Sequence, residues 1–168
     1  MSKIIQVVAR NQNNIIGDVN GDIPWICKAD ISFFYYLSIS KNIVCGRKTF
    51  EGLPEQVKNR VSAVFTRDKY YNTDKKVLHD LVDFKDYCDL SDSKQDILII
   101  GGEQVYNLTY NITDEIYLTF INDQNDIKKG AKYKHELLKS GFRKHWVLNH
   151  LIDEKTGVKF DVQHWVLK

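Results

Sequence analysis

Short runs of apolar, β-branched residues alternate with longer stretches of helical spacing, and this alternation restricts the fold more than any other feature of the chain. Five runs are expected to be buried strands: Lys3 to Ala9, Asn42 to Cys45, Arg60 to Thr66, Asp96 to Ile100 and Glu115 to Ile121. Helical spacing occupies the stretches between them: Ala29 to Ser40, Arg47 to Glu51, Leu81 to Leu90 and Glu103 to Thr109. Strands that follow one another through helices usually run parallel. The sequence therefore predicts an α/β fold with a mostly parallel central sheet and helices on both faces.

The last part of the chain departs from this alternation. Two strand-like runs, Lys144 to Ile152 and Val158 to Leu167, are separated by Asp153 to Gly157, a segment that suits a hairpin loop. We therefore expect a C-terminal antiparallel hairpin. The charged, glycine-containing segment Asn122 to Lys134 is expected to be a surface loop. No repeat or Pro/Gly/Ser linker interrupts the sequence, so residues 1–168 are expected to form a single domain.

Charge and cysteine usage favour small-molecule partners. The chain has 24 Lys+Arg against 22 Asp+Glu with the signs interleaved, which argues against nucleic acid or a membrane surface as a partner. No apolar run approaches the roughly 20 residues needed to cross a bilayer, and no leader is visible, so a cytoplasmic protein is expected, most simply a monomer. Cys27, Cys45 and Cys88 lack a C-x-x-C pair and are expected to be reduced thiols rather than zinc ligands.

Several common catalytic signatures are absent from the sequence. The five histidines form no H-E-x-x-H pattern, and no G-x-S-x-G marks a serine nucleophile, so no metal and no acyl-enzyme are expected. There is also no Walker A loop and no G-x-G-x-x-G after the first strand. Any nucleotide cofactor must therefore bind through other residues.

A polar loop from Ile16 to Trp25 leads into the first expected helix, close to Asp30. On a helix, Phe34 and Leu37 both lie within about 40° of Asp30, so a carboxylate shares a face with an aromatic and an aliphatic residue. This stretch alone leaves two interpretations open. Asp30 is either a helix cap above ordinary core residues, or the ionisable group of a pocket.

A second informative stretch is the apolar run from Ile97 to Ile100, which continues through Gly101 and Gly102 into a helix. Amide groups at such a helix start bind phosphate, and glycine permits close approach of a ligand. A diglycine after a strand also suits a simple tight turn. By itself this stretch does not decide between the two.

Taken in order, four segments resemble the dihydrofolate reductase family, and the resemblance runs from Ile4 to the C-terminal hairpin. The segments are Pro24-Trp25 followed by Asp30, Phe34 and Ser38; Val44-Cys45-Gly46-Arg47-Lys48-Thr49-Phe50-Glu51; Ile100-Gly101-Gly102 followed by Val105-Tyr106; and Ile116-Tyr117-Leu118-Thr119. The resemblance implies hydride transfer from C4 of NADPH to C6 of 7,8-dihydrofolate with protonation at N5. The product would be tetrahydrofolate, which serves one-carbon metabolism and thymidylate synthesis, and antifolates would be inhibitors.

The resemblance assigns the substrate roles residue by residue. Asp30 would hydrogen-bond N3 and the 2-amino group of the pterin, a planar donor pair that suits the two oxygens of a carboxylate. Asp30 would polarise the pterin while a water delivers the proton, with Trp25 helping to hold that water and Thr119 hydrogen-bonding Asp30. Burial is expected to raise the pKa of Asp30. The apolar wall and the arginine for the glutamate tail would come from Phe34, Leu53, Val57 and Arg60.

The cofactor roles implied by the resemblance fall on the strand ends and helix starts. The nicotinamide side would be lined by Val8, Ala9, Ile16 and Tyr106, with Val8 also touching the substrate. The pyrophosphate would lie at Gly46, Arg47, Lys48 and Thr49, and the adenosine 2′-phosphate at Arg47, Thr66 and Arg67. Further contacts would come from Ile100, Gly101, Gly102, Glu103, Gln104 and Val105. Two arginines favour NADPH over NADH, and in the family the diglycine peptide is cis.

Three departures from the family pattern are visible. The segment Asn11 to Lys28 corresponds to the family's gating loop but is one residue longer, and Cys27-Lys28 replaces the usual Leu-Pro. Cys27 either faces the ligands or is merely packed. Glu103-Gln104 replaces a frequent small-basic pair, which would place a negative charge near the pyrophosphate and lower the affinity for the cofactor.

Two rival functions remain open at this point. One is a reductase of the same fold that acts in the manner of the riboflavin-pathway enzymes. The other is a non-catalytic folate- or nucleotide-binding structural protein. The set of Asp30, Pro24-Trp25 and Arg60 argues against the first, and intact Asp30, Tyr106 and Thr119 argue against the second.

Overall fold

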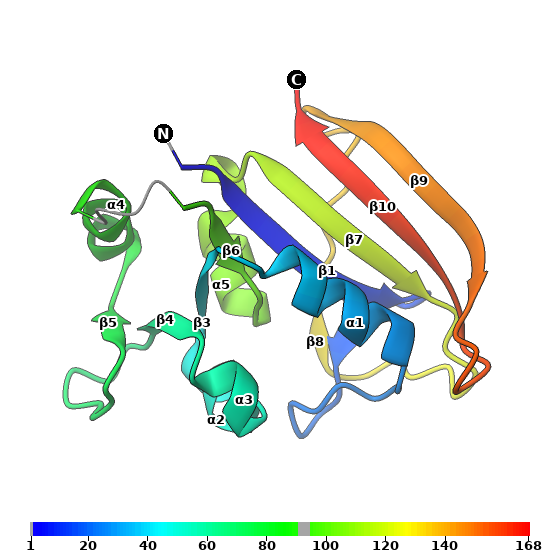
Figure 1. Cartoon of the computed structure of the whole chain (residues 1–168), viewed down its shortest axis with the longest axis horizontal. Coiled ribbons are helices and arrows are strands. Elements are labelled where there is room, and N and C mark those ends of the chain that lie inside the picture. The colour runs from blue at the N-terminus through cyan, green and yellow to red at the C-terminus, as the bar shows by residue number, and fades with distance from the viewer. Residues whose placement is uncertain (1, 91–94) are drawn as a thin grey trace.

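Eight strands form the central sheet of the computed structural model, which describes residues 2–90 and 95–168 (Figure 1). In spatial order they are β5 (Lys76–Leu78), β4 (Val61–Phe65), β3 (Asn42–Gly46), β6 (Ile97–Ile99), β1 (Ile4–Asn11), β7 (Glu115–Ile121), β10 (Lys159–Leu167) and β9 (Phe142–Ile152). The strands from β5 to β7 pair in parallel, whereas β10 is antiparallel to both β7 and β9. The predicted parallel sheet with an antiparallel C-terminal hairpin is confirmed.

Helices cover both faces of the sheet, as predicted. They are α1 (Lys28–Leu37), α2 (Arg47–Gly52), α3 (Glu55–Lys58), α4 (Leu81–Leu90) and α5 (Glu103–Thr109), followed by a short 3₁₀ turn, η1 (Tyr110–Ile112). Successive residues of a strand point to opposite faces. Val44 of β3 shares its buried cluster with Phe84 of α4 and Tyr106 of α5, whereas Ile43 and Cys45 pack with residues of α1 and α2. Therefore α4 and α5 lie on one face, and α1 and α2 on the other.

The parallel strands form because their residues are apolar throughout. Ile43, Val44 and Cys45 of β3 are fully buried, as is the whole of β6. A strand that is covered on both faces needs such an unbroken apolar run. The short apolar runs of the sequence therefore form the central strands of the sheet.

The structure corrects two of the expected boundaries. Helix α1 ends at Leu37 rather than Ser40, because the backbone of Ser40 takes a positive φ of 55°, which a helix cannot contain. The segment from Asn122 to Lys134 is not wholly a surface loop. It contains the two-residue strand β8 (Ala131–Lys132), which pairs with β2 (Ile15–Gly17) in the expected gating loop.

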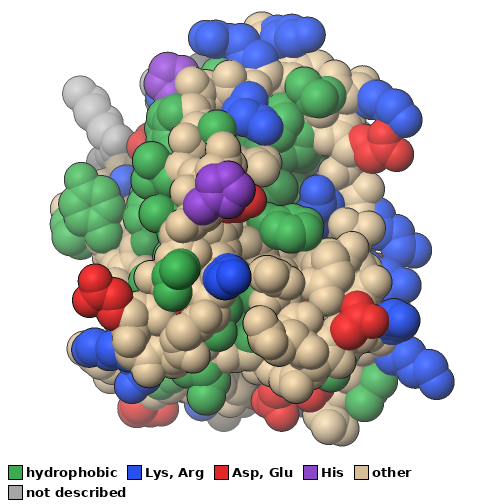
Figure 2. Space-filling model, turned by 90° about the vertical axis from the view of Figure 1, so that its right-hand side faces the viewer, with side chains coloured by type: hydrophobic (Ala, Val, Ile, Leu, Met, Phe, Trp, Pro, Cys, Tyr) green, Lys and Arg blue, Asp and Glu red, His purple; other side chains and the backbone are tan. Residues whose placement is uncertain are grey.

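The C-terminal hairpin forms one border of the sheet, with β9 as its edge strand. Figure 2 looks on to this side of the molecule and shows blue and red side chains interspersed rather than a field of one sign. Of the described helices, none is long and apolar enough to span a membrane.

Candidate active site

The side chain of Thr119 holds the carboxylate of Asp30 by a hydrogen bond between two different elements of the fold. Asp30 lies in the first turn of α1, and Thr119 lies on β7. The Thr119 hydroxyl donates to Oδ1 of Asp30 at 2.6 Å, so the hydrogen bond expected from the resemblance is present. Burial raises the pKa of Asp30 above the ordinary value of 3.8, and the hydrogen bond from Thr119 partly opposes this shift. The second oxygen, Oδ2, remains for a ligand.

Asp30 is not the cap of its helix. The amide of Lys28 donates instead to Oδ2 of Asp153 at 2.7 Å, and the hydroxyl of Thr156 binds the same carboxylate oxygen at 2.5 Å. Asp153 belongs to the loop between β9 and β10, which sequence reasoning treated only as a hairpin connection. The capping interpretation of Asp30 is therefore wrong. A distant carboxylate satisfies the helix start and leaves Asp30 available.

Apolar side chains beside Asp30 form a partly buried cluster. Phe34, Leu53 and Ile100 pack with Phe50 and Tyr71 against a fully buried group made by Ile43, Cys45, Val61 and Val64. Leu37 and Val57 are buried nearby on α1 and α3, with 8% and 3% of their surface exposed. The expected wall residues Phe34 and Leu53 thus share one cluster, and Phe34 keeps part of its ring exposed.

The ends of β3 and β6 approach so closely that glycine is required there. The amide of Gly46 donates to the carbonyl of Gly101 at 2.7 Å, and the peptide between Gly101 and Gly102 is cis, as the resemblance implied. A Cβ at Gly46 would lie 3.1 Å from Cγ2 of Val105, and one at Gly102 would lie 3.3 Å from Oγ1 of Thr49. These glycines therefore let the starts of α2 and α5 pack closely, with Thr49 and Val105 in contact with them.

Tyr106 closes the same region from α5. Its side chain is buried, and its hydroxyl donates to the carbonyl of Val7 at 2.6 Å. Burial raises the pKa of this phenol, so the hydroxyl stays protonated and acts as a donor. The neighbouring Val8 and Ile16 pack into or against the same core cluster, whereas Ala9 contributes to the cluster on the other face.

Arg47 is bound by three groups to which the sequence analysis gave no role. Its Nε binds Oε1 of Glu51 at 2.8 Å, and its Nη1 binds Oδ2 of Asp68 at 3.0 Å. Its guanidinium carbon also lies 4.6 Å from the centre of the Tyr71 ring. Glu51 is four residues from Arg47 on a helix and was readable from spacing, whereas Asp68 and Tyr71 were not.

The remaining expected phosphate-binding residues lie close to this group along the chain. Thr66 follows β4 and accepts a hydrogen bond at Oγ1 from the amide of Asp68, 3.1 Å away. Arg67 and Lys48 are exposed. No contact in the described part of the chain joins either of these two side chains to Arg47 or Thr66.

Two other charged residues of the expected site are tied to backbone groups. Nη2 of Arg60 donates to the carbonyl of Ser38 at 2.8 Å, just after the end of α1. Oε2 of Glu103 accepts from the amide of Lys132 in β8 at 3.1 Å, while Gln104 is exposed. The charge of Glu103 is therefore partly satisfied by the strand that pairs with the gating loop.

The gating loop is anchored at both ends. The buried side chain of Asn11 accepts from the amides of Asn13 and Ile15, and donates to Asp123 and to the carbonyl of Ile127. At the other end Cys27 is buried in a cluster with Ile121, Phe160 and Val162, which Trp25 also joins. Cys27 is thus a packed thiol, and burial raises its pKa.

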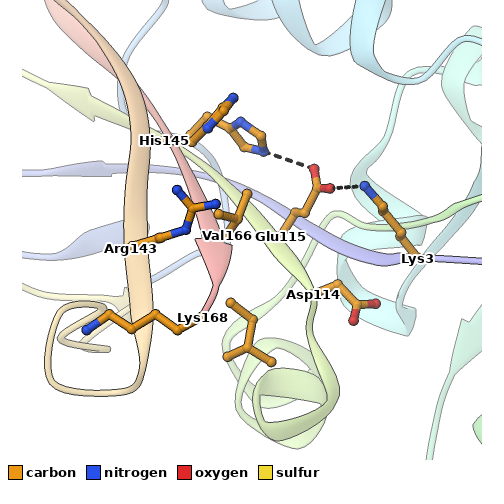
Figure 3. A pocket seen from close by; sticks show the side chains of 9 residues that line it. Lys3, Asp114, Glu115, Arg143, His145, Val166 and Lys168 are labelled. Atoms are coloured by element: carbon orange, nitrogen blue, oxygen red, sulfur yellow. Dashed lines mark hydrogen bonds and ion pairs between the residues drawn. The ribbon is translucent and has the colours of Figure 1, made fainter.

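A surface hollow lies elsewhere on the molecule. It measures about 640 Å³, and its lining includes Lys3, Asp114, Glu115, Arg143, His145 and Lys168. Figure 3 shows Lys3 and Glu115 directed toward each other, with Arg143 and His145 reaching in from β9. None of its described lining residues belongs to the motifs discussed above, so the chemistry of the motifs does not use this hollow.

The described residues contain no group of three His, Cys, Asp or Glu side chains placed to hold a metal ion. The groups that the structure does bring together are a carboxylate with a hydroxyl donor, an apolar wall, closely packed glycines between helix starts and a nearby guanidinium. This set suits binding of a flat polar ring and a phosphate-bearing ligand.

Comparison with known proteins identifies the family. A family model described as "Dihydrofolate reductase" matches residues 3–167. The dihydrofolate reductase of Mycoplasma genitalium is 29% identical over 157 residues, which cover 89% of this chain and 91% of the relative. That of Buchnera aphidicola is 33% identical over 123 residues, or 68% of each.

A solved structure shares the fold. It is a dihydrofolate reductase from Enterococcus faecalis in complex with NADP(H) and RAB-propyl, with a TM-score of 0.82 and 24% sequence identity. The match covers 98% of this chain and 95% of that one. At this identity the likeness supports the fold alone.

Proposed function

The chain belongs to the dihydrofolate reductase family, and from this premise we propose how its own residues carry out the family's reaction, the NADPH-dependent reduction of 7,8-dihydrofolate to tetrahydrofolate. One observation carries the proposal. A partly buried carboxylate, Asp30, stands in the position of the family's acid and is held by Thr119 at 2.6 Å. This bond leaves Oδ2 and a remaining lone pair of Oδ1 for a planar pair of N–H donors.

Asp30 binds and orients the pterin. Its carboxylate accepts from N3 and the 2-amino group, and the Thr119 hydroxyl fixes the plane in which the two oxygens lie. Phe34, Leu53 and Val57 provide the apolar surface against which the rings pack, whereas the buried Val8 lies in the cluster on the other face of the sheet. Arg60, already directed by its bond to Ser38, retains N–H groups for the carboxylate of the glutamate tail.

The dinucleotide would bind at the closely packed starts of α2 and α5. Gly46 and Gly102 leave no side chain there, and an anion is favoured at the amides that begin α2. When bound, NADPH supplies the hydride. Lys48, Thr49, Ile100, Gly101, Glu103, Gln104 and Val105 would hold its phosphates and ribose, and Ala9, Ile16 and Tyr106 its nicotinamide side. Arg47, Thr66 and Arg67 would meet the 2′-phosphate.

The proton reaches N5 of the substrate through water rather than directly from Asp30. Burial raises the pKa of Asp30, and its carboxylate polarises the pterin by accepting from N3 and the 2-amino group. Trp25 holds water beside Asp30, and closure of the loop from Asn11 to Lys28 excludes the remaining water. No covalent intermediate is needed.

Several broader properties complete the proposal. Residues 1–168 act as one domain and one monomer in the cytoplasm, without nucleic acid or membrane partners. Support comes from the match over residues 3–167 and from the mixed charge of the face in Figure 2. Antifolates bind in place of dihydrofolate, because they present the same donor pair to Asp30.

The decisive test is Asp30→Asn. An amide offers one acceptor in place of two and cannot ionise, so we expect hydride transfer to fall about 10²- to 10⁴-fold at neutral pH. The binding constant for NADPH should stay nearly unchanged. Turnover is followed by the loss of NADPH absorbance with dihydrofolate, and Asp86→Asn on α4 serves as the control for charge.

Unchanged turnover in Asp30→Asn would remove Asp30 from the mechanism. If the wild-type protein binds folate but oxidises no NADPH, and antifolates have no effect on any oxidation, the binding-protein alternative is favoured instead. The riboflavin-pathway alternative is favoured if NADPH oxidation requires a pyrimidine substrate rather than dihydrofolate.

A further inference from the structure

The guanidinium of Arg47 is bound on several sides by groups of the chain itself. Glu51 holds Nε at 2.8 Å, Asp68 holds Nη1 at 3.0 Å, and the Tyr71 ring lies 4.6 Å from the guanidinium carbon. All three charged side chains are between 41% and 49% exposed, so a ligand from solution can reach the group. The guanidinium of Arg47 is therefore accessible to solvent but already forms ion pairs with two carboxylates.

These two ion pairs affect how a phosphate can bind to Arg47. A guanidinium presents paired N–H donors along two edges, one made by Nε and Nη2 and the other by Nη1 and Nη2. Glu51 occupies a nitrogen of the first edge, and Asp68 occupies a nitrogen of the second. A phosphate that binds Arg47 through two parallel hydrogen bonds therefore meets a carboxylate at either edge.

The local charge opposes a phosphate as well. One guanidinium and two carboxylates sum to −1, and a phosphate monoester adds about −1.5 to −2 at neutral pH. A ribose 2′-hydroxyl carries no charge and meets no such repulsion. The side chains of Glu51 and Asp68 therefore act unequally on two cofactors that differ only in the 2′-phosphate.

Of the two carboxylates that bind Arg47, Asp68 lies outside the helices and strands. Glu51 is placed by the spacing of α2, four residues after Arg47. Asp68 lies in the loop after β4, where its Oδ1 accepts from the amide of Tyr70 at 2.9 Å, and this bond directs Oδ2 toward Arg47. An asparagine can keep the bond to Tyr70 through Oδ1 while replacing the charged oxygen at Arg47 by an amide.

We propose that Asp68 is a specificity-determining residue of this enzyme: it competes with the adenosine 2′-phosphate for Arg47 and so reduces the preference for NADPH over NADH. This inference rests on the proposed function, because it concerns the nucleotide that serves the same reaction. It adds a residue that opposes the cofactor's phosphate, whereas the arginines alone favour NADPH.

The test compares equilibrium dissociation constants for NADPH and NADH in three proteins: wild type, Asp68→Asn, and Asp86→Asn as a control for overall charge. Binding is followed by tryptophan fluorescence in the absence of dihydrofolate, so turnover is not the readout. Asp68→Asn should tighten NADPH about three- to fivefold, the upper part of the range for a partly exposed ion pair, and change NADH less than about twofold. Asp86→Asn should leave the NADPH to NADH ratio unchanged.

A second measurement isolates the phosphate. Adenosine 2′,5′-bisphosphate should bind more tightly to Asp68→Asn than to wild type, while adenosine 5′-monophosphate should bind both proteins equally. If Asp68→Asn instead weakens NADPH, or shifts both nucleotides equally, Asp68 orients Arg47 rather than competing for it, and the inference is overturned.

The proposed function can fail separately from this inference. Wild-type protein that binds neither nucleotide and does not oxidise NADPH with dihydrofolate overturns both. Wild-type protein that binds and oxidises NADPH, with an unaltered nucleotide ratio in Asp68→Asn, overturns only the role of Asp68.

Discussion

At the scale of single residues, the ionisation of Asp30 is set by two opposing effects. Burial raises the pKa of its carboxyl, and the hydrogen bond from Thr119 lowers it. Because the folded pKa lies above the ordinary value of 3.8, Asp30 favours the folded state most below that value. This contribution is lost as the pH rises through the folded pKa. The site therefore holds a carboxyl that the protein would be more stable without at neutral pH.

Thr119→Val should raise the pKa of Asp30 further, because it removes the donor that stabilises the charged form. A hydrogen bond to a charged group contributes roughly 1.5–3 kcal/mol, so the shift should be measurable. The pH profile of kcat/KM should move to higher pH, and the loss of stability with rising pH should become larger. Both are checked by steady-state kinetics and by urea unfolding at several pH values.

The matched control for this prediction is the same substitution in an Asp30→Asn background. With no carboxyl at residue 30, Thr119→Val should change neither pH dependence. If Thr119→Val moves the pH profile of kcat/KM upward by the same amount in both backgrounds, Thr119 acts on some other ionisable group.

At the scale of elements, the gating loop depends on a very short ladder. Strand β2 pairs with β8 through Ile15 with Lys132 and Gly17 with Ala131. The residue before β8, Gly130, has a φ of +140°, and a Cβ there would overlap the backbone carbonyl oxygen of Gly17. Backbone cannot swing aside as a side chain can. Gly130 is therefore what lets the two strands approach.

Gly130→Ala should destabilise the protein by about 2–3 kcal/mol, because it combines an unfavourable backbone conformation with a clash against β2. Gly21→Ala is the matched control: Gly21 also has a positive φ of 87°, but nothing lies within 4 Å of its Cβ position. That control should lose only about 1 kcal/mol. Urea unfolding measures both, and equal losses would show that the approach of β2 to β8 is not limited by Gly130.

At the scale of the whole molecule, one ion-pair network joins segments from both ends of the chain. Glu115 at the start of β7 binds Lys3 at 2.5 Å and Nε2 of His164 on β10 at 2.9 Å. His164 is in turn stacked on Tyr117, with ring centres 4.2 Å apart. Figure 1 shows that β1 begins and β10 ends on the same, upper side of the sheet.

Glu115→Gln tests the contribution of this network. Burial opposes ionisation of Glu115, but the hydrogen bonds from Lys3 and His164 outweigh it and lower the pKa of Glu115 below 4.5. Because the folded pKa is depressed, the stabilisation is present above 4.5 and is lost as the pH falls through the folded pKa. The variant should therefore be less stable than wild type at neutral pH by roughly 1–2 kcal/mol, a range that allows for the solvent exposure of Lys3.

Urea unfolding between neutral and acidic pH measures this difference, which should shrink toward zero at the acidic end. Glu55→Gln serves as the control, because the Glu55 side chain is highly exposed and its ion pair with Lys58 is long, at 3.9 Å. A difference between Glu115→Gln and wild type that stays constant with pH would assign the loss to packing rather than to charge.

The sequence by itself determined the elements that depend on local periodicity. The parallel strands were readable because burial on both faces demands unbroken apolar runs, and the helix positions because their apolar residues repeat with the helical period. The shared face of Asp30 and Phe34 followed from the same geometry. Gly101 and Gly102 were readable as positions that a ligand could approach closely, although their contacts with Gly46 and Thr49 were not readable.

Only the tertiary structure decided the contacts between residues far apart in the chain. Asp153 reaches the amide of Lys28 across 125 positions, which no spacing rule encodes, and so frees Asp30 from capping. Strand β8 is too short to carry a periodic signal, and it forms because β2 offers it a partner. Arg47 was identified as a cation for phosphate, but Asp68 and Tyr71 meet it only after the loop beyond β4 folds back. Local patterns fix which atoms are available, whereas packing decides which of them remain free to bind a ligand.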